Sequence, residues 1–102
     1  MMYTIKQTEA FETWLRGLRD LKTRQRLATR LRKASLGNLG DVKPVGDGVF
    51  EMREQFGPGW RMYYVIRGEV VIVMLGGGDK SSQSADISKA IRLAAQLGWR
   101  GT

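Results

Sequence analysis

Two neighbouring stretches with strand-like alternation bring charged and phenolic side chains together. Glu51 and Arg53 are two residues apart and share one face of the first stretch, and Arg61 and Tyr63 do the same in the second. The Gly-Pro-Gly turn at residues 57–59 can fold both stretches into a hairpin that places the two pairs side by side. Guanidinium groups bind phosphate, while a carboxylate and a phenol can carry protons. The group predicts phosphate chemistry; the alternative is an ordinary cross-strand salt bridge between Glu51 and an arginine.

A second candidate is the segment 76–83, with the sequence Gly-Gly-Gly-Asp-Lys-Ser-Ser-Gln. It follows an apolar stretch and opens a helix, where free backbone N–H groups favour anions. The glycine spacing to Lys80 is not that of a P-loop, and a tight turn capped by Asp79 or Ser82 explains the same composition. Lys80 and Gln83 leave the sheet toward one end, so they can converge with the hairpin group.

Further basic and aromatic residues are candidates for contact with a nucleic acid, which the family resemblance described below narrows to RNA. A helix over residues 22–33 has the charge density to follow a phosphate backbone, although a solvated basic helix face is the alternative interpretation. Trp60 either stacks on a base or packs against its own turn. The RNA-contact candidates are Lys22, Arg26, Arg30, Lys33, Lys43, Trp60 and Gln83.

The composition excludes several kinds of site. The chain has no cysteine and no histidine, so it lacks the two commonest zinc ligands and the base of a Ser-His or Cys-His pair. We therefore expect no metal and no cofactor. Seventeen Lys and Arg against ten Asp and Glu give a net charge of +7. That excess implies nucleic acid, an acidic protein or an anionic membrane surface as partner, or simply a solvated basic surface.

Length and hydropathy predict one domain over residues 1–102, with no linker or repeat. No apolar run reaches the roughly 20 residues of a membrane-spanning helix, and the start of the chain has no secretory pattern. We therefore expect a cytoplasmic protein that does not act at a membrane.

Period-two alternation predicts the strands. They are expected at residues 3–7, 49–53, 61–66 and 70–75, with an additional extended stretch at 42–45. The run 70–75 is apolar on both faces, which is typical of a strand in the middle of a sheet, and should end at the glycines that follow it. The hairpin side chains that alternate with the polar group, and are expected in the core, are Phe50, Met52, Met62 and Tyr64.

Apolar spacing of three and four residues predicts three helices. The first should cover residues 9–19 after Thr8 as cap, and the second should follow Asp20 to make an αα-hairpin. The third begins near Ser81 or Ser82 and stops at Gly98. The element order β-α-α-β-β-β-α predicts an α+β fold whose helices cover a mainly antiparallel sheet.

Together these motifs resemble the HigB-type (Gp49-like) addiction-module killer proteins of the RelE/ParE toxin superfamily. The resemblance covers nearly the whole chain. It rests on the strings 48–53, 57–64 and 75–83, on Asp86-Ile87 and Ala90, on the helix of Phe11, Trp14 and Leu15, and on the turn 37–41.

The resemblance implies a RelE-like fold and a toxin whose neighbouring gene encodes a HigA-like antitoxin, often with a helix-turn-helix domain. RelE- and HigB-type relatives cleave mRNA, commonly on the ribosome, whereas ParE-type relatives poison DNA gyrase. Carried over by position, Arg61 matches the arginine that contacts the scissile phosphate, and Arg53 and Lys80 match neighbouring basic positions. Val49 and Glu51 stand where RelE carries lysines, and the C-terminal tyrosine of RelE has no equivalent near Asp86.

A metal-independent endoribonuclease is thus the first functional hypothesis. A ribose 2′-hydroxyl attacks the adjacent phosphate, while Arg53, Arg61 and Lys80 offset the developing charge. Glu51 is the candidate base, and Tyr63 the candidate proton donor or base stacker. The alternatives are a gyrase-poisoning toxin, a binding protein without chemistry, or a remnant that has lost toxicity.

Overall fold

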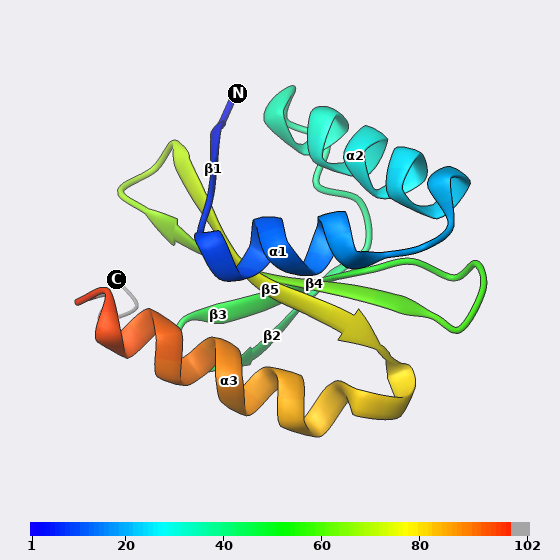
Figure 1. Ribbon diagram of the computed structural model, residues 1–102. Helices are drawn as coiled ribbons and strands as arrows, with labels where there is room; N and C mark the ends of the chain where they lie inside the picture. Colours follow the sequence, from blue (N-terminus) through cyan, green and yellow to red (C-terminus); the bar gives the residue numbers. More distant parts are fainter. Residues whose placement is uncertain (99–102) are drawn as a thin grey trace.

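The computed structural model describes residues 1–98, which form a five-stranded sheet with helices on both faces (Figure 1). The element order adds one strand to the predicted order. The elements are β1 (Thr4–Gln7), α1 (Glu9–Gly17), α2 (Leu21–Ser35), β2 (Val42–Gly46), β3 (Val49–Arg53), β4 (Trp60–Arg67), β5 (Val71–Asp79), a short 3-10 helix η1 (Lys80–Ser82) and α3 (Gln83–Gln96).

The sheet has the strand order β1-β5-β4-β3-β2. Only β1 and β5 are parallel; β5, β4, β3 and β2 pair antiparallel, so the prediction of an α+β fold with a mainly antiparallel sheet is confirmed. The extended stretch predicted at 42–45 is the paired edge strand β2, where Pro44 fits because an edge strand tolerates a missing N–H. No helix among residues 1–98 is both long and apolar enough to cross a membrane.

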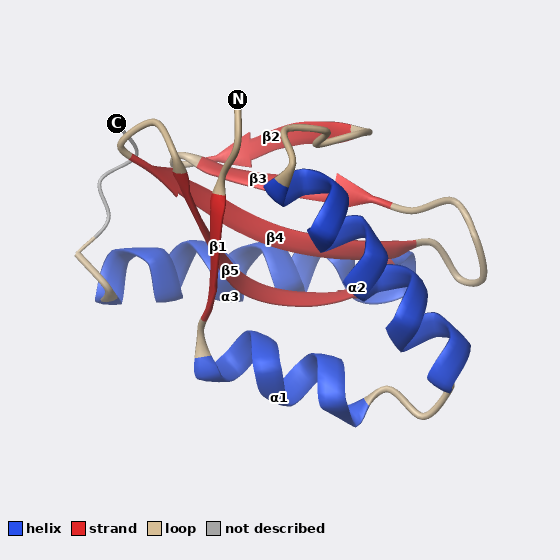
Figure 2. Ribbon diagram, turned by 90° about the horizontal axis from the view of Figure 1, so that it is seen from above, coloured by secondary structure: helices blue, strands red, loops and turns tan. Residues whose placement is uncertain are grey.

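Each face of the sheet has its own hydrophobic core. On one face α1 and α2 bury Phe11 and Leu27 against Met52, Met62 and Tyr64 with their neighbours. On the other face α3 packs over a second apolar cluster (Figure 2). That second cluster contains Val49, Tyr63, Val65, Val73, Leu75, Ala90 and Ala94.

The helix ends follow their local sequence signals. Thr8 caps α1 by accepting a hydrogen bond from the backbone N–H of Phe11 at 3.2 Å, as predicted. The helix ends at Gly17, two residues before the predicted end, because Leu18 already has an extended backbone. At the other end of the chain, α3 stops at Gln96, and Gly98 takes the left-handed conformation common just after a helix.

The glycine run after residue 75 corrects the sequence prediction. β5 does not end at Gly76 but continues through the three glycines to Asp79. A side chain at Gly77 would collide with the Trp14 ring of α1, and one at Gly78 would collide with the Asp86 carboxylate of α3. These glycines therefore allow α1 and α3 to approach β5 closely, and the turn itself begins only at Asp79.

Candidate active site

The hairpin of β3 and β4 has the register expected from the sequence. Arg53 lies directly opposite Arg61, and Glu51 lies opposite Tyr63. Directly opposed residues of an antiparallel pair project from the same face, so all four side chains gather on one side of the sheet.

That face is covered by α3, which corrects the expectation of an open polar face. Tyr63 is completely buried, Glu51 is 1% exposed and Arg61 is 7% exposed. Burial, reinforced by the negative charges of Glu51 and Asp86, raises the pKa of the Tyr63 phenol. Tyr63 cannot stack on a base from this position, and a substrate hydroxyl cannot reach Glu51. The burial of both side chains therefore argues against the direct catalytic roles expected for them.

The Arg61 guanidinium is anchored on two sides. Its Nη1 donates to the backbone oxygens of Trp60 at 3.1 Å and Glu54 at 3.4 Å. Its Nε lies 3.9 Å from Oε2 of Glu51. Within residues 1–98, Nη2 has no hydrogen-bond partner, so one edge of the guanidinium can still receive an anion.

Lys80 joins Arg61 at Gly59. A β-carbon added at Gly59 would lie 2.6 Å from Cδ of Lys80 and 3.6 Å from Nη1 of Arg61. Gly59 is buried and has a φ of +81°, so a side chain there is excluded by both space and backbone conformation. The ammonium of Lys80 has no ion-pair partner in the described part of the chain. The predicted convergence of the η1 turn with the hairpin is therefore observed.

Arg53 is held at the outer side of this group by Asp41, which precedes β2. Nη2 of Arg53 donates to Oδ1 of Asp41 at 3.0 Å, and the Arg53 side chain remains 33% exposed. The hydrogen bond from Arg53 lowers the pKa of the Asp41 carboxyl, and Asp41 in turn raises the pKa of Arg53. Arg53 can therefore still meet a ligand from solvent.

The anion site expected at the start of the last helix is occupied by a side chain of the protein. Asp79 accepts a hydrogen bond from the backbone N–H of Ser81 at 2.8 Å, which matches the alternative of a capped turn. Gln83, the first residue of α3, points to the sheet and donates to both oxygens of Glu51, at 2.8 and 3.1 Å.

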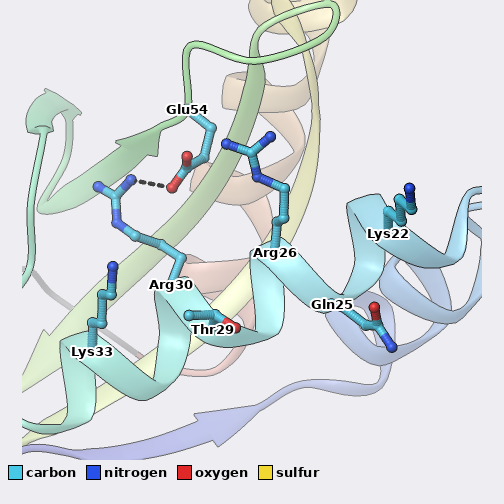
Figure 3. A pocket seen from close by; sticks show the side chains of 7 residues that line it. All are labelled: Lys22, Gln25, Arg26, Thr29, Arg30, Lys33 and Glu54. Atoms are coloured by element: carbon cyan, nitrogen blue, oxygen red, sulfur yellow. Dashed lines mark hydrogen bonds and ion pairs between the residues drawn. The ribbon is translucent and has the colours of Figure 1, made fainter.

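A basic groove of about 380 Å³ lies between α2 and the loop that follows β3 (Figure 3). The α2 positions recur every three or four residues, so they form a stripe along one side of the helix. Arg26 stacks its guanidinium 3.8 Å from the centre of the Phe56 ring beside the groove. The groove is lined by Lys22, Gln25, Arg26, Thr29, Arg30, Lys33 and Glu54.

Arg30 differs from the other cations of the groove, because its donors are already used. It pairs with Glu54 at 2.5 Å and donates to the backbone oxygens of Leu39, Asp41 and Arg53. Its side chain is 10% exposed. Arg30 therefore ties α2 to β2 and β3, and it is not available to RNA as the sequence suggested.

The last two RNA-contact candidates are Lys43 and Trp60. Lys43 is exposed on edge strand β2, opposite Glu51 in register. The Trp60 ring meets Trp14 edge-on at 6.2 Å between ring centres, in agreement with the alternative in which it packs on the fold.

Sequence reasoning missed three residues that organise the site. Asp41 holds Arg53, and Glu54 joins the groove to the hairpin because its carboxylate binds Arg30 while its backbone oxygen accepts from Arg61. Gly59 provides the space for Lys80. The Gly-Pro-Gly turn was the one available signal, since two glycines around a proline often mark a demanding backbone.

Comparison with known families identifies the family of the chain. Residues 13–97 match the family described as Phage derived protein Gp49-like (DUF891). The chain belongs to the Gp49-like family. A similar protein, an uncharacterized protein of Haemophilus influenzae, is 41% identical over 98 residues, which cover 96% of this chain and 99% of that protein.

Solved structures show that this Gp49-like protein has the fold of RelE. A mutant of the E. coli toxin RelE in the free state superposes with a TM-score of 0.72 at 21% identity, covering 91% of this chain and 98% of that one. A chain of the toxin–antitoxin complex RelBE2 from Mycobacterium tuberculosis matches with a TM-score of 0.65 at 22% identity, covering 78% and 100%. The predicted Gp49-like family and the predicted RelE-like fold are both confirmed.

Proposed function

We propose that this Gp49-like protein is the toxin of a type II toxin–antitoxin system and cleaves mRNA on the ribosome without a metal ion. Its RelE fold and its family support the toxin assignment. The M. tuberculosis relative is part of a toxin–antitoxin complex, which supports a cognate antitoxin as partner. The partner expected here is a HigA-like protein with a helix-turn-helix domain. The ribosomal substrate places the protein in the cytoplasm.

The convergence of Arg53, Arg61 and Lys80 carries the proposal. Arg53 and Arg61 face each other across β3 and β4, and Lys80 crosses Gly59 beside Arg61. Three cations at one end of a sheet attract an anion electrostatically. Nη2 of Arg61 adds a hydrogen-bond donor for that anion. A phosphodiester that crosses Gly59 meets Arg61 and Lys80 together.

The chemistry needs charge stabilisation more than it needs a metal. The 2′-oxygen of the ribose bonds to phosphorus, the 5′-oxygen leaves, and the upstream fragment ends in a 2′,3′-cyclic phosphate. The cations offset the additional charge of the phosphorane. The 2′-hydroxyl proton passes to solvent or to a ribosomal group, and the departing 5′-oxygen takes a proton from the same source. The ribosome supplies the in-line geometry, which is itself a large part of the barrier.

The α2 groove extends the site into a track for single-stranded RNA. The start of α2, the loop after β3 and the end of β5 lie at the same end of the sheet (Figure 1). Lys22, Arg26 and Lys33 line the groove and have no ion-pair partner among the described residues. We assign these three residues to the RNA backbone, because phosphate contacts set affinity and register without reading sequence.

One observation favours a second candidate, a gyrase-poisoning or other binding toxin without chemistry. Glu51 and Tyr63 are buried, so neither can act on a substrate directly. An enzyme with this site depends on the ribosome or on solvent for proton transfer, whereas a binding toxin needs no such groups.

A cleavage assay on translating ribosomes separates the two candidates. We expect the wild-type protein to cleave mRNA, and Arg61→Ala to lower the rate by about 10²- to 10³-fold, as loss of one key donor commonly does. Arg92→Ala, an exposed α3 substitution, serves as the charge-matched control. Intact mRNA with wild-type protein, together with inhibition of gyrase supercoiling, would establish the binding toxin instead.

The toxin assignment has its own test in cells. Induced expression should arrest growth, and co-expression of the adjacent gene should restore it. Growth arrest by wild type but not by Arg61→Ala would link toxicity to the site, while normal growth with abundant wild-type protein would contradict the toxin assignment.

A further inference from the structure

Glu51 is a carboxylate enclosed in the interior between β3 and α3. It is 1% exposed and lies among the apolar residues Val49, Tyr63 and Val65 of the second core. An ionised carboxylate loses several kcal/mol of hydration on burial unless nearby groups replace the water. A buried carboxylate at this position therefore needs hydrogen-bond donors or a positive charge nearby, and the identity of these groups indicates its role.

Gln83 and Arg61 face the Glu51 carboxylate directly, and the Arg53 guanidinium adds a longer-range charge interaction. The side-chain amide of Gln83 donates to both carboxylate oxygens, at 2.8 and 3.1 Å. Nε of Arg61 lies 3.9 Å from Oε2, near enough for a charge interaction but too far for a hydrogen bond. The amide therefore fixes the carboxylate in place, and the fixed carboxylate faces the guanidinium.

The same contacts orient Arg61. Its Nη1 is directed to the backbone oxygens of Trp60 and Glu54, and its Nε is directed to Glu51. Within residues 1–98, Nε makes no hydrogen bond, and Nη2 has neither a hydrogen bond nor an ion pair. If the carboxylate were displaced, the guanidinium would lose its attraction toward the interior, and the direction of Nη2 would no longer be fixed.

Gln83 also connects the two segments that carry the cations. It is the first residue of α3 and follows the η1 turn that carries Lys80, while Glu51 belongs to the strand next to Arg61. One amide–carboxylate contact thus fixes the η1 turn relative to the hairpin. Changing it should disturb Arg61 and Lys80 together.

We propose that Gln83 and Glu51 act as a positioning pair that holds Arg61, and with it Lys80, in the geometry needed for phosphate binding. This inference rests on the proposed function, and it gives Glu51 a role that its burial permits. The pair does not touch the substrate. It acts on the transition state through Arg61, as groups behind a reacting side chain commonly do.

The experiment compares Gln83→Leu, which removes the amide at similar size, with Gln96→Leu, the same substitution at the exposed end of α3. Two readouts are needed: single-turnover mRNA cleavage on ribosomes, and hydrogen exchange of the Arg61 side-chain Nε–H by NMR. Gln83→Leu should lower the cleavage rate at saturation by roughly tenfold with little change in KM, because positioning affects the reacting geometry more than association. Exchange at Arg61 should become faster, while Gln96→Leu leaves both unchanged.

A double variant that exchanges the two side chains distinguishes a positioning role from a purely structural one. Glu51→Gln combined with Gln83→Glu rebuilds an amide–carboxylate contact with the same total charge. It should return both readouts to within about threefold of wild type, since the two sites are directly coupled. Recovery of thermal stability without recovery of the rate or of slow exchange would overturn the inference.

The two proposals fail in different ways. If the wild-type protein cleaves RNA but Gln83→Leu leaves the rate and the Arg61 exchange unchanged, the positioning pair is wrong and the proposed function stands. If the wild-type protein cleaves nothing, the proposed function is wrong, and the exchange rates still decide whether Gln83 and Glu51 hold Arg61.

Discussion

Arg53 and Arg61 occupy directly opposed positions on β3 and β4, so two permanent positive charges face each other across one hairpin. Like charges in this arrangement cost up to about 1 kcal/mol. Each arginine has its own compensating carboxylate, Asp41 at 3.0 Å and Glu51 at 3.9 Å. An anion bound between the two guanidinium groups would relieve this repulsion further, and the predictions below test the residues that shape the proposed site.

Gly59→Ala should damage the site more than the fold. Its positive φ costs a non-glycine residue about 1 to 2 kcal/mol, and the new methyl group would also push Lys80 aside. Gly68→Ala is a matched control, because Gly68 has a φ of +60° and open space around its Cβ position. Thermal denaturation should show similar losses of stability for both, while RNA cleavage should fall only for Gly59→Ala. Equal activity of the two variants would argue against Lys80 as part of the site.

Arg30→Ala and Arg26→Ala should separate stability from RNA binding within one helix. Arg30 pairs with Glu54 and serves three backbone oxygens, so its loss should cost about 3 kcal/mol of unfolding free energy. Arg26 stacks on Phe56 at the groove, and its loss should cost less than about 1 kcal/mol.

For RNA affinity we expect the reverse: among folded variants, Arg26→Ala should weaken RNA binding more than Arg30→Ala. Arg26→Ala and Lys33→Ala should each weaken binding of a single-stranded RNA and reduce the slope of log K against log salt by about one. Salt titrations measure this directly. An unchanged slope in both variants would remove the α2 groove from the RNA path.

Gly77→Ala should be strongly destabilising, and Gly76→Ala should not. A methyl group at Gly77 would enter the Trp14 ring, which costs about 1 to 3 kcal/mol in a well-packed core. At Gly76 nothing lies within 4 Å of the added carbon, and the lower entropy of the unfolded chain offsets what little is lost. Urea denaturation of the two variants provides the comparison. Equal stabilities would contradict the close approach of α1 to β5.

The buried tyrosines predict a loss of stability in alkaline solution. Burial raises the pKa of Tyr63, and that of Tyr64 to about 12, so the folded protein keeps phenolic protons that the unfolded chain releases from about pH 10. Folding stability should therefore be intact below pH 10 and fall as the pH rises through the folded pKa values.

Tyr63→Phe isolates one part of that effect. Its hydroxyl is buried without a partner among residues 1–98, so removing it should leave neutral-pH stability equal or higher by about 1 kcal/mol. The alkaline decline should become shallower, and RNA cleavage should persist. Abolished cleavage by a well-folded Tyr63→Phe protein would restore Tyr63 as a proton donor.

The hairpin could be predicted from the sequence because alternation and a short turn together fix a register. Glu51 and Arg53 with Arg61 and Tyr63 share a face for that reason. The helix that covers that face could not be predicted from strand alternation. The apolar Val49 and Val65, which lie on the face of this polar group, were the one indication that α3 would bury it.

Other features depend on partners that are distant in the sequence. Three consecutive glycines are typical of turns, yet Gly77 lies within β5 because Trp14 packs against it. A basic helix does not show which of its cations find acceptors, and only the fold directs Arg30 to three backbone oxygens. Tertiary contacts, not local propensity, decided both cases.

The most direct test of the proposed cleavage mechanism removes one 2′-hydroxyl group from the substrate. Cleavage of an mRNA on translating ribosomes is compared with the same message carrying a 2′-deoxyribose at the cleaved nucleotide. We expect 2′,3′-cyclic phosphate ends from the unmodified message and no cleavage at the modified position. Arg61→Ala should lower the cleavage rate of the unmodified message by about 10²-fold or more. Equal cleavage of both messages, or a rate that is unaffected by Arg61→Ala, would contradict an in-line transfer centred on Arg61.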